Sequence, residues 1–223
     1  MDTDEIGNEE VVFDILKQLF SPGQTKEEVK DGYNSWADTY ETDSNPDRYT
    51  GPIQAAMECC EVIPEANRED ALVLDVAAGT GFLGNELQLK GFRNLHALDP
   101  STKMLEKANT RNIYQKLINK FISEEPLIQV EADTYDIVAS SGGMGQGHIP
   151  AGALWEMLRI TRQGGFIILV MREEYLRHPE YDGILEVLME NMEKTRKWKM
   201  IKKRIIQKYF AEKEGVAFVF KKA

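Results

Sequence analysis

The chain has 223 residues, of which 42% are hydrophobic and 29% charged, and its formal net charge at pH 7 is −10. This size and composition predict one large domain with a substantial core rather than two small ones. The negative charge argues against wholesale binding to nucleic acid, whose phosphates call for a basic face. No stretch approaches the roughly 20 unbroken apolar residues that a membrane span needs, so no membrane partner is expected.

The N-terminal stretch, MDTDEIGNEE, is acidic, whereas a secretory signal begins with a basic segment followed by an apolar one. Cys59 and Cys60 are neighbours, which is a poor layout for a disulfide framework or a zinc site. We therefore expect a cytoplasmic protein without a metal centre.

One segment is strongly basic: residues 194–208, KTRKWKMIKKRIIQK, which include the aromatic Trp198. One interpretation is a patch for an anionic substrate or an RNA backbone. We favour a solvated helix face followed by a strand, because such charge runs are usually solvated.

The first third of the chain predicts three helices. An apolar segment over 11–20 ends at Ser21-Pro22-Gly23, and 26–43 has aromatic and aliphatic residues at helical spacing. Pro52 then opens a helix over 53–63.

From residue 71 the pattern alternates between strands and helices. Ser101 is a predicted N-cap, and glycines are expected at the exit of the third of these helices. Strands that alternate with helices of about 10–15 residues predict βαβ units and a parallel sheet. The predicted strands are 71–77, 94–99, 116–122, 134–141 and 166–172, and the predicted helices are 81–91, 101–111 and 151–165.

The C-terminal part departs from this alternation. A helix over 182–198 is followed by two β-like runs, 205–212 and 215–222, with a short glycine-containing link. Such a link cannot carry a crossover, so these runs are expected to pair antiparallel. The predicted fold is α/β, with a mostly parallel sheet and a C-terminal antiparallel hairpin.

The nine residues 73–81, VLDVAAGTG, follow the first strand of this sheet with a run of small residues. Small residues there let the backbone approach a ligand closely, at the edge where open α/β sheets bind ligands. A dinucleotide site needs G-x-G-x-x-G, but the spacing here is A-x-G-x-G, with Asp75 two positions upstream. A carboxylate repels a pyrophosphate and attracts an ammonium, so the loop fits a ligand without phosphates better.

Asp99 ends the second predicted strand, roughly 20 residues beyond the loop, where a carboxylate accepts hydrogen bonds from both hydroxyls of a ribose. The alternative is that Asp99 caps the following helix together with Ser101. The pairing with the glycine loop favours the ribose.

The segments VLDVAAGTGFLG, LDPSTKMLEKA, YDIVASSGG and LRITRQGGFIILV resemble the successive motifs of class I S-adenosylmethionine-dependent methyltransferases. The resemblance covers about residues 30–223. It implies a Rossmann-like seven-stranded sheet with helices on both faces and the last strand inserted antiparallel. It also implies residues 51–223 as the methyltransferase domain, 1–50 as a helical lid, S-adenosyl-L-methionine as cofactor and S-adenosyl-L-homocysteine as product.

Residue roles follow from the resemblance. Gly79 and Gly81 are expected to line the methionine moiety, with Asp75 holding the loop and the ligand's ammonium. Asp99 is expected to bind the ribose, and Met104 to pack near the adenine. The residues implied to bind the cofactor are Tyr33, Trp36, Tyr40, Asp75, Ala77, Gly79, Thr80, Gly81, Asp99, Pro100, Met104 and Ser140.

Several of these positions keep alternatives. Tyr33, Trp36 and Tyr40 resemble aromatics that fold over the cofactor, or they form an ordinary apolar helix stripe. Ser140 and its neighbour Ser141 are expected to face the methyl group and the substrate.

Two positions depart from the family pattern. Its first loop glycine is Ala77 here. At the end of the third strand, where the family usually supplies an aspartate for the adenine amino group, the chain has Asn119 and Lys120. Either Asn119 accepts from the adenine with its amide oxygen, or backbone groups hold the adenine alone.

The donor's methyl group is already activated, so the protein must align an acceptor at roughly 3–3.5 Å and supply a base where the acceptor is protonated. His148, after the flexible GGMGQG run, and Tyr40 are the candidate catalytic residues, with Glu173 and Tyr175 also near the mouth. His148 as a loop residue that caps the next helix is the alternative.

The predicted partner is a small-molecule methyl acceptor, since SSGGMGQGHIP is unlike the Asn-Pro-Pro-Tyr motif of enzymes that methylate amide or base amino groups. Methylation of a protein side chain, a non-catalytic binding module and a nicotinamide dehydrogenase are the alternatives. The oligomeric state is left open.

Overall fold

The computed structural model describes residues 15–17, 19, 21, 23–44 and 49–223. The helix predicted over 11–20 therefore lies largely outside the described residues. The helix predicted over 26–43 is divided into α2 (Lys26–Trp36) and α3 (Tyr40–Asp43). α2 begins at a capping box, in which Thr25 Oγ1 accepts from Glu28 N and the Glu28 carboxylate accepts from Thr25 N.

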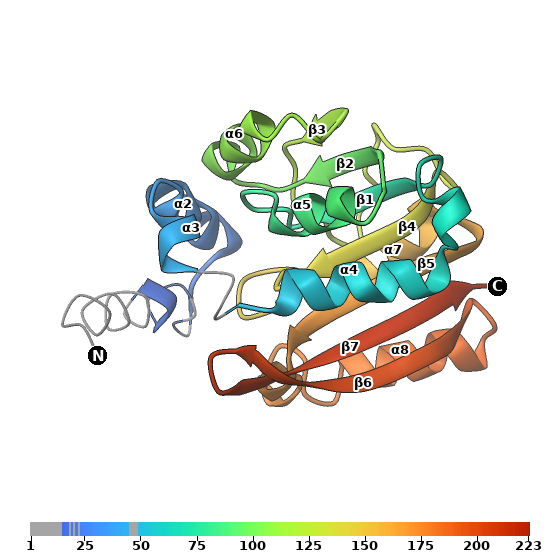
Figure 1. The fold of residues 1–223 in the computed structure, drawn as a ribbon. Helices are drawn as coiled ribbons and strands as arrows, with labels where there is room; N and C mark the ends of the chain where they lie inside the picture. The colour runs from blue at the N-terminus through green and yellow to red at the C-terminus, as the bar shows by residue number, and fades with distance from the viewer. Residues whose placement is uncertain (1–14, 18, 20, 22, 45–48) are drawn as a thin grey trace.

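A seven-stranded sheet forms the centre of the molecule, in the order β3-β2-β1-β4-β5-β7-β6 (Figure 1). The contacts among β1 to β5 are parallel, and β7 is antiparallel to both of its neighbours. The predicted mostly parallel sheet with an antiparallel C-terminal hairpin is confirmed. Its strands are β1 (Leu72–Val76), β2 (Asn94–Leu98), β3 (Lys116–Ile118), β4 (Tyr135–Ser141), β5 (Thr161–Arg172), β6 (Trp198–Phe210) and β7 (Lys213–Lys222).

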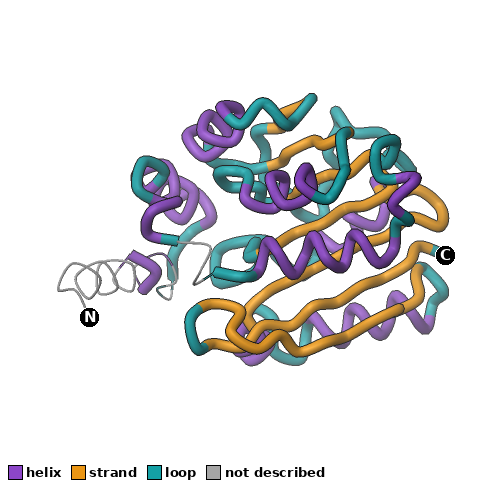
Figure 2. Tube along the Cα trace, viewed as in Figure 1, coloured by secondary structure: helices purple, strands orange, loops and turns teal. Residues whose placement is uncertain are grey.

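Helices cover both faces of this sheet (Figure 2). Apolar residues of α4 and α5 pack on one face, and those of α7 and α8 pack on the other. The remaining elements are α4 (Gly51–Val62), α5 (Phe82–Leu89), α6 (Thr102–Thr110), α7 (Ala153–Ile160), α8 (Leu185–Lys194) and the short 3₁₀ helices η1 (Glu65–Asn67) and η2 (Glu173–Arg177).

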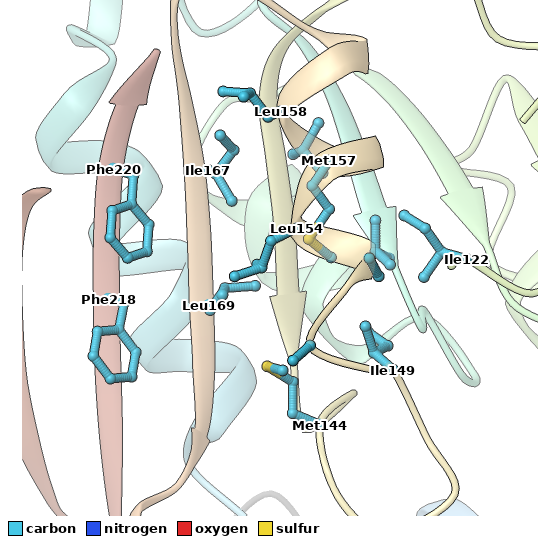
Figure 3. Close-up of a cluster of buried hydrophobic side chains, with 14 of the residues drawn as sticks. Ile122, Met144, Ile149, Leu154, Met157, Leu158, Ile167, Leu169, Phe218 and Phe220 are labelled. Carbon is cyan, nitrogen blue, oxygen red and sulfur yellow. The ribbon is translucent and has the colours of Figure 1, made fainter. Parts of the chain in front are cut away.

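The larger apolar layer lies between α7 and the central strands (Figure 3). Leu154 and Met157 of α7 belong to one cluster with Leu169 of β5 and Phe218 of β7, and all four are at most 1% exposed. Burying a side chain of this kind stabilises the fold by about 1.5–3 kcal/mol. The same cluster includes Ile149, which also lines the functional cavity, so the core and the site share a wall.

The helix predicted over 151–165 is five residues too long. α7 ends at Ile160, and the hydroxyl of Thr161 donates to Met157 O. The TRQGG segment begins β5, whose register with β4 shifts between Tyr135 and Ile137. A Cβ on Gly165 would lie 2.8 Å from the carbonyl oxygen of Asp136, so close strand approach requires this glycine.

The C-terminal elements also begin and end differently from the prediction. α8 ends at Lys194, and Trp198 starts β6, where its Nε1 donates to Met189 O at 3.1 Å. Gly215, the first residue of the predicted run 215–222, lies within β7, and glycine is required there because the ring of Tyr209 packs where a Cβ would stand.

The basic segment 194–208 is therefore mostly strand. Lys202 and Arg204 of β6 pair with Glu58 of α4, at 2.8 Å (Nζ to Oε2) and 2.6 Å (Nη2 to Oε1). Two cations of the basic segment thus form ion pairs that connect the edge strand β6 to α4. Across the described residues, no helix is long and apolar enough to cross a membrane.

Candidate functional site

A cavity of about 750 Å³, including its open mouth, lies where the carboxyl ends of β1, β2 and β4 meet α2. This is the edge at which open α/β sheets bind ligands. The lining residues are Lys26, Val29, Lys30, Tyr33, Tyr40, Tyr49, Ala77, Gly79, Leu98, Asp99, Pro100, Ser101, Met104, Phe121, Ile122, Ser141, Gly142, Gly143, Gly147, His148 and Ile149.

The loop after β1 opens onto this cavity at Gly79. Gly79 has φ +55°, and a Cβ built on it would meet no atom within 4 Å. Gly81, at φ +90°, instead packs against Tyr114, which a Cβ would approach to 3.1 Å. Ala77 has φ +57°, a conformation that costs an L-residue about 1–2 kcal/mol. The backbone at Gly79 thus borders open space in the cavity, whereas Gly81 packs against Tyr114, and a ligand contact at either glycine remains a prediction.

Asp99 connects this loop to α6 through its carboxylate. Its Oδ2 accepts from Gly79 N and its Oδ1 accepts from Ser101 N, each at 2.8 Å. The side chain of Ser101 is the N-cap, accepting from Met104 N, as predicted. An ionised carboxylate has about four acceptor positions, so Asp99 can position the loop and still accept from ligand hydroxyls. The ribose contact remains a prediction.

Asp75 lies outside the cavity wall. Its Oδ2 accepts from the hydroxyl of Tyr114 at 2.6 Å. Burial, helped by the negative charge of Asp99 and opposed by the hydrogen bond from Tyr114, raises the pKa of Asp75 to about 7. Burial likewise raises the pKa of Asp99 to about 6. Asp75 therefore supports the loop from behind, and its contact with an ammonium remains a prediction.

These raised pKa values predict that the ligand-free protein loses stability as pH rises. The folded chain holds a proton that the unfolded chain releases on Asp75 between about pH 4 and pH 7 and on Asp99 between about pH 4 and pH 6. Within its window each group favours unfolding at higher pH by up to about 1.4 kcal/mol per pH unit. Asp75→Asn should flatten this dependence. Urea unfolding at pH 5 and pH 7 measures it, with the exposed Asp70→Asn as control. Equal slopes for Asp75→Asn and wild type would contradict the assignment.

The N-terminal helices lie against α6 and cover the cavity. Asn34 of α2 accepts at Oδ1 from the hydroxyl of Ser101 at 2.8 Å. Arg111, just after α6, pairs with Glu41 of α3 at 2.7 Å. The segment predicted as a lid therefore contacts the loop that follows β2.

The three predicted aromatics of this segment take different positions. Tyr33 and Tyr40 line the cavity. Trp36 does not line it, because its buried Nε1 donates to Asp43 Oδ2 at 2.7 Å and its ring packs on both tyrosines. Trp36 thus holds the tyrosines from behind.

His148 lines the cavity and pairs with Tyr33. Its Nδ1 lies 2.6 Å from Gln146 O, which assigns the ring proton to Nδ1, and its Nε2 accepts from the Tyr33 hydroxyl at 2.8 Å. Burial lowers the pKa of His148 to about 4, so the ring is neutral at physiological pH. The expected helix-capping role is not among these contacts.

The serine that faces the cavity is Ser141, and its Oγ lies 3.2 Å from the hydroxyl of Tyr49. Ser140 points to the opposite face of β4, where its buried Oγ has no hydrogen-bond partner among the described residues, like Oγ1 of Thr80. Successive side chains of a strand alternate between faces, which is why only one serine reaches the cavity.

Asn119 does not line the cavity, and its amide is committed to the turn after β2. Its Nδ2 donates to the carbonyls of Asp99 and Pro100, and its Oδ1 accepts from Thr102 at 3.2 Å. This arrangement argues against a hydrogen bond from the adenine amino group to the Asn119 oxygen, and it favours the other option, in which backbone groups hold the adenine. Phe121, beyond it, supplies an apolar wall instead.

Sequence reasoning missed several walls of the cavity. Tyr49 lies between α3 and α4, and Phe121 and Ile122 follow the short β3, where no motif marks them. Three other lining residues, Gly142, Gly143 and Gly147, belong to the glycine-rich run before His148, which the sequence does mark. Within the part of the chain that the structure describes, no cluster of His, Cys, Asp or Glu is placed to hold a metal ion.

Two comparisons of the sequence with known proteins both match methyltransferases. A family model described as a methyltransferase domain matches residues 74–169. Human methyltransferase-like protein 27 is 34% identical over 166 residues, which are 74% of this chain and 66% of that protein. The segments YNSWADTYETD and NLHALDPSTKMLEKA had themselves predicted a resemblance to that protein, which this identity confirms. The chain spans slightly less than two thirds of this relative.

Solved structures share the fold at low sequence identity. A TehB-like SAM-dependent methyltransferase from Corynebacterium glutamicum has a TM-score of 0.58 at 17% identity, covering 87% of this chain and 98% of that one. A SAM-dependent methyltransferase from Aquifex aeolicus also has a TM-score of 0.58, at 16% identity, with 85% and 98% covered. A chain from the complex of the Haloferax volcanii Trm112 methyltransferase activator with a methyltransferase has a TM-score of 0.61 at 17% identity, with 85% and 97% covered.

Proposed function

The chain belongs to the class I S-adenosylmethionine-dependent methyltransferase family, and on that premise we propose that it transfers a methyl group from S-adenosyl-L-methionine to a small-molecule acceptor. The observation that carries this proposal is the open backbone cradle at Gly79, bonded to the carboxylate that ends β2. A ligand that combines an amino acid with a nucleoside and has no phosphate matches this pair.

The residues of the cavity fit the cofactor. Gly79 leaves room for the methionine part, and Asp99 offers its remaining acceptor positions to ribose hydroxyls. Met104, which is 1% exposed, and Phe121 give apolar walls to the adenine. When bound, the cofactor supplies a methyl group that needs no further activation.

The chain's own part in the reaction is to align the acceptor, exclude water and accept a proton. Tyr33 and Tyr40 cover the cavity from α2 and α3, and we propose the segment up to residue 50 as the lid that closes it. The Tyr33 hydroxyl donates to His148 Nε2, so a proton taken up by the Tyr33 oxygen is matched by one passed to His148. This pair can therefore remove the proton of a protonated acceptor as the acceptor's bond to the methyl group forms.

The proposal is tested first by binding. Calorimetry with S-adenosyl-L-homocysteine should show one site per chain, and NAD should show none. A screen of metabolite extracts for methyl acceptance then tests turnover. Tight binding of NAD without S-adenosyl-L-homocysteine would support a dehydrogenase, and cofactor binding without turnover across the screen would support a binding module.

His148→Ala is expected to slow turnover of a protonated acceptor by roughly 100-fold, because general-base catalysis contributes about that much or more. Its pKa of about 4 predicts that the wild-type rate shows no titration of this ring between pH 5.5 and 8. Steady-state rates against pH measure both effects. Cofactor affinity serves as the control and should change little. Turnover of the variant at the wild-type rate would remove His148 from the mechanism.

A further inference from the structure

A second hollow of about 450 Å³ adjoins the cofactor cavity. The two share Tyr33, Tyr40, Tyr49 and Gly142 as walls, so a molecule in the second hollow lies beside a cofactor in the first. This volume includes its open mouth. Its lining residues are Leu16, Tyr33, Trp36, Tyr40, Ser44, Tyr49, Gly142, Arg172, Tyr175, Tyr209 and Phe210.

Arg172 is the one cation in this wall among the described residues. It ends β5, its side chain is 15% exposed, and its guanidinium lies 4.7 Å from the ring centroid of Phe210 and 5.6 Å from that of Tyr175. Its one ion pair with a described residue, Glu174, is long at 3.4 Å. Glu174 in turn pairs with Lys213 at 2.9 Å. Among the described residues only Glu174 accepts a hydrogen bond from this guanidinium, so most of its five N–H donors are left for a ligand.

Tyrosine hydroxyls form a polar line along the same wall. Ser141 Oγ lies 3.2 Å from the Tyr49 hydroxyl, which lies 3.4 Å from that of Tyr209. Ser141 faces the cofactor cavity and Tyr209 faces the second hollow. The positive charge of Arg172 opposes the burial that raises the pKa of Tyr209, so this charge acts within the hollow. The site thus combines flat aromatic walls, hydroxyls and one cation.

We propose, building on the methyltransferase function above, that this hollow binds the methyl acceptor and that Arg172 binds a carboxylate on it. The acceptor class is then a small monocarboxylate with a flat apolar body. The aromatic rings contact the body, and the planar guanidinium matches a carboxylate with two parallel hydrogen bonds.

The charges in the wall favour a carboxylate over a phosphate. Among the described residues a single cation lines the hollow, and a carboxylate oxygen of Glu174 lies 3.4 Å from its guanidinium. One positive charge balances a monoanion, whereas a phosphate ester carries up to two negative charges at pH 7. Phosphorylated acceptors are therefore expected to bind less well.

The experiment compares matched probes on the full chain saturated with S-adenosyl-L-homocysteine. Calorimetry measures the affinities of 4-hydroxyphenylacetate, indole-3-acetate and benzoate, each against its primary amide, and of phenyl phosphate. At least one carboxylate should bind tenfold or more tightly than its amide, which has the same shape but no charge, and more tightly than phenyl phosphate.

Variants assign the preference to one side chain. Arg172→Gln should abolish the preference for the carboxylate, Arg172→Lys should keep part of it, and both should bind S-adenosyl-L-homocysteine like the wild type. Arg177→Gln is the matched control, because Arg177 also pairs with a nearby glutamate, Glu173, but is 64% exposed and faces neither cavity.

Several results would overturn this inference. They are equal affinities for acids and amides, no binding of any probe, tighter binding of phenyl phosphate, or a preference that survives in Arg172→Gln. Failure of S-adenosyl-L-homocysteine itself to bind would instead overturn the proposed function, so the two are distinguished.

Discussion

Asp99→Ala is expected to weaken the binding of S-adenosyl-L-homocysteine by roughly 100-fold or more. Hydrogen bonds to a charged group are worth about 1.5–3 kcal/mol each, so two ribose hydroxyls account for about 3–6 kcal/mol. The substitution also removes the acceptor for Gly79 N and Ser101 N, which Asp99 holds at 2.8 Å each. The cradle thus loses both a ligand contact and its connection to α6.

Asp136→Ala is the matched control for that loss. Asp136 accepts from Leu72 N at 2.8 Å, a bond of the same kind, but at the opposite end of β1 from the cavity. Both variants should unfold at lower urea concentration than the wild type, and only Asp99→Ala should lose affinity in calorimetry. Unchanged affinity in Asp99→Ala, or an equal loss in the control, would exclude the ribose contact.

The sequence predicts the order of the sheet's elements well because buried parallel strands are short apolar runs. The run around β1 is buried along almost its whole length, and its glycine loop follows at once. Glycine is where the prediction fails. Gly165 resembles a helix exit, yet it lies in β5, where glycine is required because the carbonyl oxygen of Asp136 leaves no room for a side chain.

A site residue can be predicted from the sequence only where a local motif marks it. Gly79 and Asp99 stand at strand ends marked by motifs, so both were found at the cavity. Arg172, Tyr49 and Tyr209 come from three distant segments, and no pattern in the sequence brings them together. The choice between Ser140 and Ser141 depends on a register of one residue, which reverses the face of every side chain in a strand.

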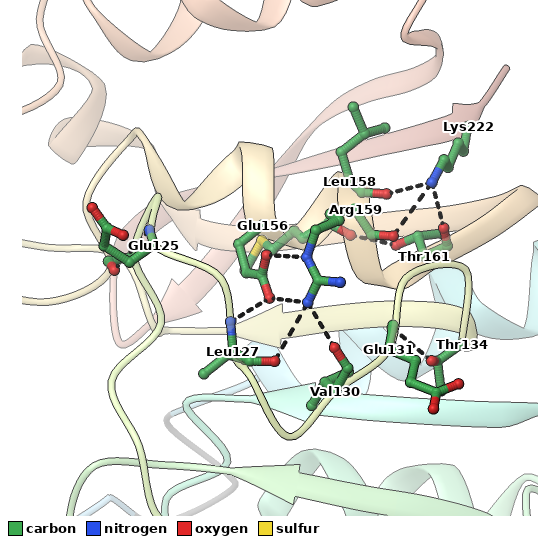
Figure 4. Close-up of polar contacts among 12 residues, drawn as sticks. Glu125, Leu127, Val130, Glu131, Thr134, Glu156, Leu158, Arg159, Thr161 and Lys222 are labelled. Carbon is green, nitrogen blue, oxygen red and sulfur yellow. Dashed lines mark hydrogen bonds and ion pairs between the residues drawn. The ribbon is translucent and has the colours of Figure 1, made fainter.

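Glu156→Ala is expected to lower the free energy of unfolding by about 3 kcal/mol, because it leaves a partly buried arginine without its partner. Glu156 of α7 is 2% exposed, and its carboxylate accepts from Leu127 N at 2.9 Å and from Arg159 at 2.7 and 2.8 Å (Figure 4). Arg159 also donates to Val130 O at 2.7 Å. Its side chain is 31% exposed, so water screens part of its charge and the loss falls at the lower end of the range for buried pairs.

Glu190→Ala is the control for this loss. Glu190 pairs with Lys194 on α8 at 3.2 Å, but both side chains are more than 60% exposed, so its removal should cost less than about 1 kcal/mol. Urea unfolding measures both variants, and equal effects would show that the Glu156 network does not stabilise the fold. The cavity wall should survive in Glu156→Ala, because its residue Ile122 belongs to the buried apolar cluster and makes no bond of this network among the hydrogen bonds of the described residues. Affinity for S-adenosyl-L-homocysteine should then stay within a few-fold of wild type, which separates loss of stability from loss of the site.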